Sequence, residues 1–129
     1  MKIIGIGVDI VDNARFKKLV KKKQFINRIC SSKELYNLKK KNNKISFLSK
    51  RFSAKESFVK ALGTGFRNNL SFKDISILND KKGKPYFVFN EIIKNILKKK
   101  YRLKKFKAHL SLSDEKKYSV SYVILEKLK

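Results

Sequence analysis

The chain has 129 residues, 42% of them hydrophobic, and a formal net charge of +24. This length favours a single domain, residues 1–129, with a modest core that neighbouring subunits would help to complete, and no apolar run is long enough to cross a bilayer. Cys30 is the only cysteine and no export signal opens the chain, which excludes an internal disulfide and leads us to expect a cytoplasmic protein.

The first predicted elements are a strand and a basic helix. The β-branched, glycine-spaced run Ile3–Ile10 predicts a buried strand, and Asp12 or Asn13 can then cap a helix that continues to about Lys23. The apolar positions of this helix are Phe16, Leu19 and Val20. Its other side is basic and is followed by two more apolar residues; this set includes Arg15, Lys18, Lys21, Lys22, Phe25, Ile26 and Arg28.

A short helix and a long one are predicted next. Ser31 and Glu34 have capping-box spacing, which predicts a short helix to about Lys41. The long helix runs from about Ser46 to Leu62, where two nearby glycines end it.

The long helix has two different faces. At about 100° per residue, one face is apolar and carries Phe47, Ala54, Phe58 and Ala61. Glu56 points the opposite way, with Ser49, Ser53 and Lys60 beside it. We therefore expect the helix to bury one face and to present a second, mixed face that carries a carboxylate.

The second half of the chain is predicted to contain four strands and one helix. Asp74–Leu78 and Tyr86–Phe89 form a hairpin across a polar connection, and Asn90 can cap the helix that follows. Phe106–Ser113 and Tyr118–Leu125 are the last two strands. This order predicts an α+β fold in which helices pack on an antiparallel sheet.

Asp9 and Glu56 are the two acidic residues that the pattern singles out. Asp9 ends an otherwise apolar strand, and Glu56 lies in the middle of a helix. Each has an ordinary explanation, because Asp9 can cap the following turn and Glu56 can form an ion pair with Lys60. Two carboxylates from separate elements are also the usual protein share of a magnesium site, which completes its ligands with water and substrate phosphates.

Basic side chains could hold those phosphates. The candidates are Arg51, Lys55, Lys60 and Lys84. Gly63-Thr64-Gly65 is explained equally well by a helix C-cap and by a phosphate contact, and an isolated histidine such as His109 is more often structural. This set predicts a metal-assisted displacement at phosphorus.

Four blocks of the sequence resemble those of the bacterial holo-acyl-carrier-protein synthases, a branch of the 4'-phosphopantetheinyl transferases. They are Gly5–Val11, Arg51–Gly65, Asn79–Pro85 and His109–Ser113, in the order of the family, and the resemblance covers essentially the whole chain. It implies an enzyme that transfers 4'-phosphopantetheine from coenzyme A to a serine of apo acyl carrier protein, gives adenosine 3',5'-bisphosphate, and supports fatty acid biosynthesis. Ser53 and Ser57 stand where alanine is common in the family.

The resemblance also implies roles for single residues. Asp9 and Glu56 would bind Mg²⁺, and Lys60 would lie near the transferred phosphate or assist the leaving group. Asp9, directly or through a metal-bound water, would help to deprotonate the carrier serine. The coenzyme A site would be lined by Arg51, Lys55, Gly63, Thr64, Gly65, Lys84, Pro85 and His109.

Two protein partners follow from the resemblance. The basic first helix would dock the acidic carrier protein, through ion pairs of Arg15, Lys18, Lys21, Lys22 and Arg28 and apolar contacts of Phe25 and Ile26. Longer relatives carry two tandem copies of the fold with the site between them. This chain carries one copy, which implies a homotrimer with a site at each subunit interface.

Other functions stay open on the sequence alone. The charge favours a nucleic-acid-binding or ribosome-associated module without catalysis. However, only 5 of the 34 basic residues are arginine, the residue that base-reading proteins favour, and a lysine-rich compositional bias explains part of the charge. We therefore expect no specific nucleic-acid partner. An oligomer that has lost catalysis, a transferase that modifies carriers of other pathways, and manganese in place of magnesium are the remaining alternatives.

Overall fold

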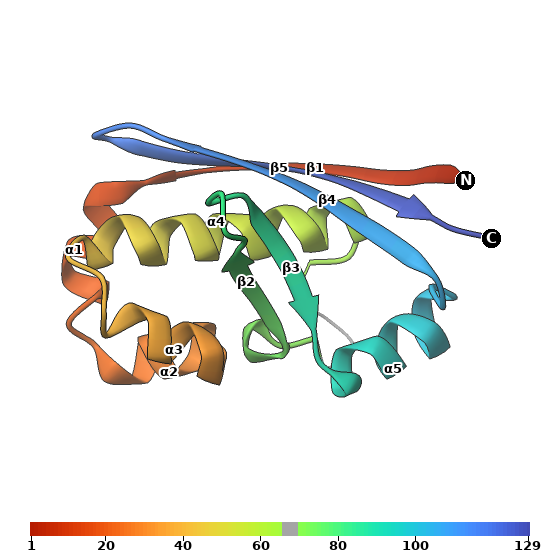
Figure 1. The fold of residues 1–129 in the computed structure, drawn as a ribbon, viewed down its shortest axis with the longest axis horizontal. Helices are drawn as coiled ribbons and strands as arrows, with labels where there is room; N and C mark the ends of the chain where they lie inside the picture. Colours follow the sequence, from red (N-terminus) through yellow and green to blue (C-terminus); the bar gives the residue numbers. More distant parts are fainter. Residues whose placement is uncertain (66–69) are drawn as a thin grey trace.

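The computed structural model describes residues 1–65 and 70–129, and it has the predicted α+β architecture (Figure 1). The strands are β1 (Lys2–Asp12), β2 (Ile75–Asn79), β3 (Pro85–Phe89), β4 (Phe106–Asp114) and β5 (Tyr118–Lys127). The helices are α1 (Phe16–Leu19), α2 (Lys23–Ile29), α3 (Ser32–Leu38), α4 (Lys44–Leu62) and α5 (Glu91–Tyr101), with 3-10 turns η1 (Asn13–Arg15) and η2 (Phe72–Asp74). In the described ranges, no helix is both long and apolar enough to cross a membrane.

The strands form two antiparallel sheets instead of the single sheet that we expected. One sheet has three strands in the order β1-β5-β4, and the other is the predicted hairpin β2-β3. The hairpin crosses α4, as Figure 1 shows, because its apolar side chains pack against that helix. The hairpin does not extend the larger sheet beside β4. The prediction of antiparallel pairing is confirmed, and the prediction of one sheet is wrong.

Helix α4 lies along the inner face of the three-stranded sheet and touches strand β1 with its backbone. A Cβ atom on Gly7 would lie 1.9 Å from the carbonyl oxygen of Ser57, and one on Gly5 would lie 1.8 Å from that of Ala61. Only glycine permits an approach this close. The predicted helix end is confirmed, because Gly63 takes the left-handed conformation with φ +86° and caps the last turn.

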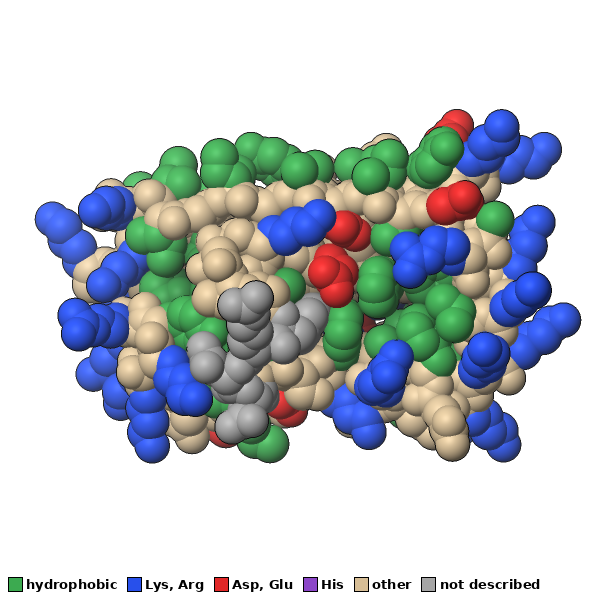
Figure 2. Space-filling view, turned by 180° about the vertical axis from the view of Figure 1, so that it is seen from behind, with side chains coloured by type: hydrophobic (Ala, Val, Ile, Leu, Met, Phe, Trp, Pro, Cys, Tyr) green, Lys and Arg blue, Asp and Glu red, His purple; other side chains and the backbone are tan. Residues whose placement is uncertain are grey.

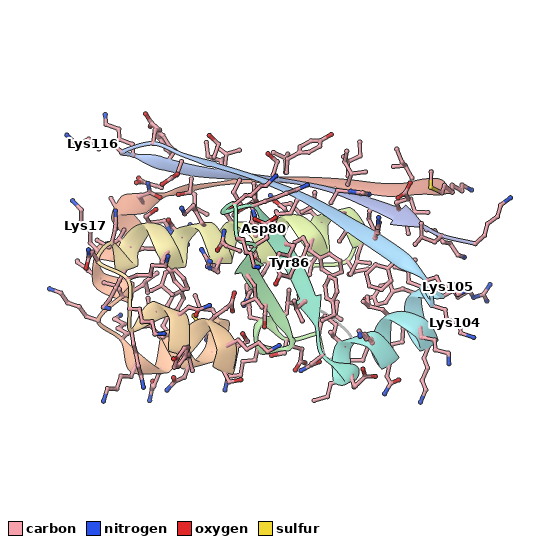
Figure 3. The ribbon with its side chains drawn as sticks, viewed as in Figure 1. Lys17, Asp80, Tyr86, Lys104, Lys105 and Lys116 are labelled. Carbon is pink, nitrogen blue, oxygen red and sulfur yellow. The ribbon has the colours of Figure 1, made fainter. Side chains whose placement is uncertain are left out.

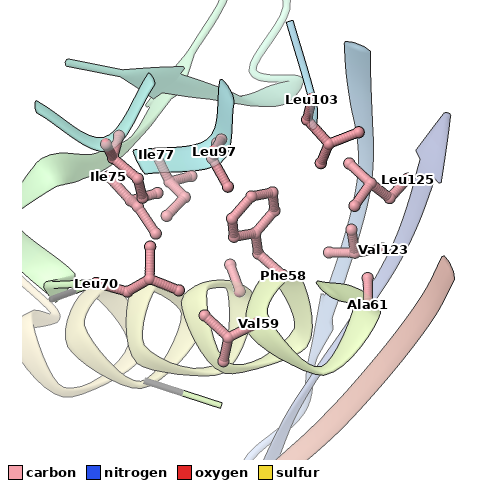
Figure 4. Packing of buried hydrophobic residues seen from close by; sticks show 12 residues of the cluster. Phe58, Val59, Ala61, Leu70, Ile75, Ile77, Leu97, Leu103, Val123 and Leu125 are labelled. Carbon is pink, nitrogen blue, oxygen red and sulfur yellow. The ribbon is translucent and has the colours of Figure 1, made fainter. Parts of the chain in front are cut away.

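Two apolar clusters flank α4. The larger one lies between α4, α5 and the two sheets and is centred on Phe58 (Figure 4). The centroid of the Phe58 ring is 4.9 Å from that of Phe89 and 5.5 Å from that of Phe87. The smaller one joins α4 to the helices at the N-terminal end of the fold through Phe16, Phe47 and Leu48. The face predicted to be apolar is therefore buried.

Strand β1 is not buried on both faces, contrary to the prediction. Ile6, Val8 and Ile10 are 59%, 55% and 61% exposed in this single chain. Helices cover only the inner face of the sheet, so every second side chain of β1 points away from the core. The apolar run of β1 predicts the strand correctly, but it does not predict what covers the outer face of that strand.

The predicted first helix is broken into η1, α1 and α2. Asp12 caps η1 as expected, since its side chain accepts a hydrogen bond from the Ala14 N–H at 2.9 Å. Phe16 and Phe25 are nine residues apart, which places them on opposite sides of a continuous helix. The break lets both rings pack on Phe52, at centroid distances of 5.5 and 6.4 Å.

Two other predicted helix starts are confirmed. Ser31 and Glu34 make both hydrogen bonds of a capping box at the start of α3, although the helix ends at Leu38 and not near Lys41. Asn90 caps α5 by accepting a hydrogen bond from the Ile93 N–H.

Candidate active site

Asp9, Glu56 and Lys60 meet where α4 crosses β1. The Lys60 ammonium donates to Asp9 Oδ1 and to the Val8 carbonyl oxygen, both at 3.0 Å. Glu56 lies one turn earlier on α4 and is half-buried. Burial is the larger cause that raises the pKa of Glu56, and the negative charge of Asp9 is the second. Neither ordinary explanation describes this site. Asp12, and not Asp9, caps the turn after β1, and Lys60 is paired with Asp9 and not with Glu56.

This arrangement fits a divalent cation. Asp9 Oδ2 is buried and has no hydrogen-bond partner among the described residues, which is unfavourable for a carboxylate oxygen unless something else binds it. Two nearby carboxylates raise the energy of each other's charged form, and a cation between them would lower it. No group of three or more potential metal-ligating side chains occurs in ranges 1–65 and 70–129, and Asp9 and Glu56 are the two carboxylates that would hold the ion.

The sequence predicted that α4 presents its second, mixed face, but most of this face is not exposed to solvent. Ser49, Ser53 and Ser57 are fully buried against strand β5, and only Glu56 and Lys60 reach the edge of that contact. Small side chains suit this face because the helix lies so close to the sheet.

Lys55 does not lie where the prediction placed it. Its ammonium donates to Glu34 Oε1 and to the Ile29 carbonyl oxygen, both at 2.6 Å, and to the Phe72 carbonyl oxygen at 3.0 Å. Both side chains of the ion pair are 0% exposed, and burial lowers the pKa of Lys55. Lys55 is enclosed by protein, so the prediction that it contacts coenzyme A is wrong.

Arg51 is also largely buried, at 5% exposure. Its guanidinium carbon lies 3.8 Å from the ring centroid of Phe47, and the group donates to Asn79 Oδ1 at 2.8 Å. Burial lowers its pKa. Arg51 thus ties α4 to the start of the hairpin turn, and its contact with a ligand stays a prediction.

Lys84, Pro85 and His109 line one cavity of about 890 Å³ between β3, α5 and β4. Tyr86, Lys104 and Lys105, which also line this cavity, are labelled in Figure 3. His109 Nε2 lies 3.2 Å from the Glu126 carboxylate. We call this space the β3–β4 cavity.

The predicted site residues therefore form two groups. Among the described residues that line the β3–β4 cavity, Asp9, Glu56 and Lys60 are absent. Gly63–Gly65 follows α4, and the Thr64 hydroxyl accepts a hydrogen bond from the Tyr101 hydroxyl at 3.2 Å. Within one chain, the carboxylates of Asp9 and Glu56 lie at one place and the basic, aromatic cavity lies at another.

The predicted docking residues gather at the end of the molecule opposite α5 (Figure 1). The five basic ones are exposed, whereas Phe25 and Ile26 are half-buried in the smaller apolar cluster. A groove beside α2 is lined by Leu19, Lys22, Lys23, Gln24, Phe25 and Arg28. An apolar floor with a basic rim fits an acidic helix.

Sequence reasoning missed Glu34 and Ser121. Glu34 was explained by its capping box, and nothing local indicates that it also pairs with Lys55. Ser121 lies opposite Asp9 in the β1–β5 register and bonds to α4, which is visible only once the register is known. The serines at 49, 53 and 57, spaced by four, were the available signal.

Comparisons with known proteins show the family and the fold of the chain. The family model described as the 4'-phosphopantetheinyl transferase superfamily matches residues 5–123. A holo-[acyl-carrier-protein] synthase of Pelagibacter ubique is 60% identical over 127 residues, covering 98% of this chain and 99% of the relative. A crystal structure of such a synthase from Neisseria meningitidis has a TM-score of 0.87 and 36% identity, covering 98% of this chain and 100% of that one. One from Bacillus anthracis, in complex with CoA (3',5'-ADP), has a TM-score of 0.81 and 33% identity, covering 98% of each chain.

Glu56→Gln is expected to raise the melting temperature of the metal-free protein at pH 7. The raised pKa means that the folded state binds this proton more tightly than the unfolded state, so ionisation of Glu56 lowers stability as pH rises above its ordinary value of 4.5. Glutamine removes that ionisation. Thermal unfolding in the presence of a chelator, from pH 4.5 to 7, measures the difference.

Glu91→Gln is the matched control, because Glu91 is exposed on α5. A lower melting temperature for Glu56→Gln than for this control would contradict the electrostatic argument.

Proposed function

The chain belongs to the 4'-phosphopantetheinyl transferase superfamily, and we propose that Asp9, Glu56 and Lys60 are its catalytic centre. It is an enzyme that transfers 4'-phosphopantetheine from coenzyme A to apo acyl carrier protein, in support of fatty acid biosynthesis. The observation that carries the proposed centre is the buried Oδ2 of Asp9, which has no hydrogen-bond partner in the described part of the chain, beside the half-buried Glu56.

Asp9 and Glu56 would hold Mg²⁺. When bound, this ion would supply positive charge that stabilises the negative charge developing on the phosphates of coenzyme A. Asp9 Oδ2, which has no hydrogen-bond partner among the described residues, and the raised pKa of Glu56 support the assignment, because two carboxylates here share the single positive charge of Lys60. Lys60 supplies one positive charge through Asp9 Oδ1, and its 51% exposed side chain leaves the ammonium within reach of a substrate phosphate.

The transfer is a displacement at phosphorus. The hydroxyl oxygen of the carrier serine forms a bond to the phosphorus attached to pantetheine, and the bond from that phosphorus to the bridging oxygen breaks. Adenosine 3',5'-bisphosphate leaves with the electron pair of the broken bond. The serine proton passes to the Asp9 carboxylate, directly or through water, and Lys60 stabilises the negative charge on the transferred group.

The coenzyme A site is proposed to lie between two subunits. Asp9, Glu56 and Lys60 are not among the described residues that line the β3–β4 cavity, so a neighbour's Lys84, Pro85 and His109 would complete the site next to Asp9 and Gly63–Gly65. The aromatic walls of the cavity would suit an adenine ring, and its lysines would suit phosphates.

The outer face of the three-stranded sheet supports a homotrimer. Hydrophobic side chains form a row along the sheet in Figure 2, and the exposed ones include Ile6, Val8, Ile10 and Tyr122. A contiguous apolar face of this kind is typical of a protein interface. Basic side chains surround the rest of the molecule in that view, so the apolar face is the one where like charges would not oppose association.

Incubation of apo acyl carrier protein with this protein, coenzyme A and Mg²⁺ is expected to increase the carrier's intact mass by one phosphopantetheine group. Asp9→Ala, Glu56→Ala and a chelator should each slow the transfer by at least about 100-fold, because even changes to residues behind metal ligands cost 10- to 100-fold. No gain of mass with several carrier proteins and a folded sample would contradict the proposal, and binding to RNA would then be tested.

The double change Lys22→Glu with Arg28→Glu is expected to raise the KM for the carrier protein about tenfold at low salt, with kcat unchanged. Both side chains border the groove beside α2. The effect should shrink as salt is added, because exposed charges are screened. Lys99→Glu with Lys100→Glu makes the same change of charge on α5 and should leave KM within about twofold.

Light scattering is expected to give three times the 15.1 kDa mass of one chain. Ile6→Glu places a charge on the outer sheet face and should yield monomers with at least about tenfold less activity, because each site would lose its second half. Ile92→Glu is the control, since Ile92 is 60% exposed on α5, away from that face. A fully active unaltered protein with the mass of a single chain would contradict the shared site.

A further inference from the structure

A buried line of serines runs from α4 through β5 to Asp9. The hydroxyls of Ser57 and Ser121 are hydrogen-bonded, the Ser121 and Ser53 hydroxyl oxygens are 2.7 Å apart, and the Ser53 hydroxyl donates to the Asp9 carbonyl oxygen at 3.2 Å. All three serines are 0% exposed. We call Ser57, Ser121 and Ser53 the serine relay.

One placement of the three protons satisfies the whole relay. Ser57 donates to Ser121, Ser121 donates to Ser53, and Ser53 donates to the Asp9 carbonyl oxygen. The Ser121 hydroxyl also lies 2.7 Å from the Ser53 carbonyl oxygen, so a second proton position still joins β5 to α4. Hydrogen bonds in such a chain polarise one another, which makes the terminal bond to Asp9 stronger than an isolated one.

The relay and Lys60 hold Asp9 from both sides of Glu56. Ser53 lies three residues before Glu56 and Lys60 four residues after it, so all three lie along one side of α4. Ser53 binds the carbonyl oxygen of Asp9, and Lys60 binds its carboxylate. The position of Asp9 relative to Glu56 is therefore fixed at two points along the helix.

We propose that Ser53, supported by Ser121 and Ser57, is a positioning residue that sets the distance between Asp9 and Glu56 and thereby the affinity for the divalent cation. This inference rests on the metal site proposed above. Ser53 is fully buried, and its hydroxyl bonds to the Asp9 carbonyl oxygen and to Ser121. Its effect passes through the Asp9 backbone, which bears the carboxylate with the unpartnered oxygen.

Mn²⁺ binding tests the proposal without turnover. Free Mn²⁺ is measured by electron paramagnetic resonance, with the full-length protein and coenzyme A present and no carrier protein. Ser53→Ala is expected to weaken Mn²⁺ binding about three- to tenfold, which is the range for one net hydrogen bond. The carrier-dependent reaction should show the same weakening in the metal concentration required for half-maximal rate, with kcat at saturating metal changed less than about twofold.

Ser49→Ala is the matched control. Ser49 is a buried serine on the same helix, and it bonds to Ser119 and to the Ser46 carbonyl oxygen but not to Asp9. Its loss should lower the melting temperature about as much as Ser53→Ala while leaving Mn²⁺ affinity unchanged. Equal weakening by both variants would overturn the proposal, because general loosening of α4 would then explain the effect.

The triple change of Ser53, Ser57 and Ser121 to alanine separates positioning from stability. The triple variant leaves none of the three hydroxyls unpaired, so its melting temperature should be no lower than that of Ser53→Ala. The triple variant therefore also provides a folded sample if the single variant folds poorly. Mn²⁺ affinity should stay weak, since Asp9 still lacks its donor. Wild-type affinity in Ser53→Ala or in the triple variant overturns the serine relay alone, whereas no Mn²⁺ binding by the unaltered protein overturns the metal site itself.

Discussion

The close approach of α4 to β1 is the constraint on which the rest of the structure depends. Two glycines in β1 allow helix backbone to lie against strand backbone, where a methyl group would come within 2 Å of a carbonyl oxygen. This contact brings the middle of a helix within bonding distance of the middle of a strand. As a result, Lys60 reaches two oxygens of β1, and Glu56 lies close enough to Asp9 to be affected by its charge. The other small residues along this contact also allow the helix to lie this close to the sheet.

The same contact separates two kinds of burial around α4. On one side the helix buries Phe58 and its apolar neighbours, which stabilise the fold. On the side that faces β5 it buries serines, with two carboxylates at the edge, and the Lys55–Glu34 ion pair lies elsewhere, where the helix meets α2, α3 and η2. Two buried side-chain atoms have no hydrogen-bond partner among the described residues: Arg51 Nε, in a guanidinium that is held by Asn79 and the Phe47 ring, and Asp9 Oδ2, which lies in the candidate site.

Local sequence signals predicted most elements but not their tertiary partners. The period and caps of α4, α3 and α5 were visible because apolar spacing and capping side chains act within a few residues. The break between α1 and α2 was not, since it depends on Phe16 and Phe25 both reaching Phe52. Asp9 and Glu56 stood out as acids in unusual settings, and the structure brings them together. Lys55 was misassigned because its partner, Glu34, lies 21 residues earlier and already had a local explanation.

The enclosed ion pair has a consequence for how this chain can change over generations. Most of its lysines lie on the surface, where exchange with other polar residues alters little. Lys55 and Glu34 differ, because removing one of them leaves the other as a bare charge away from water, at a cost of about 3–5 kcal/mol. Replacement of both by apolar side chains of similar volume would avoid that cost. The two positions therefore constrain each other, and descendants of this sequence should keep the pair or lose both members together.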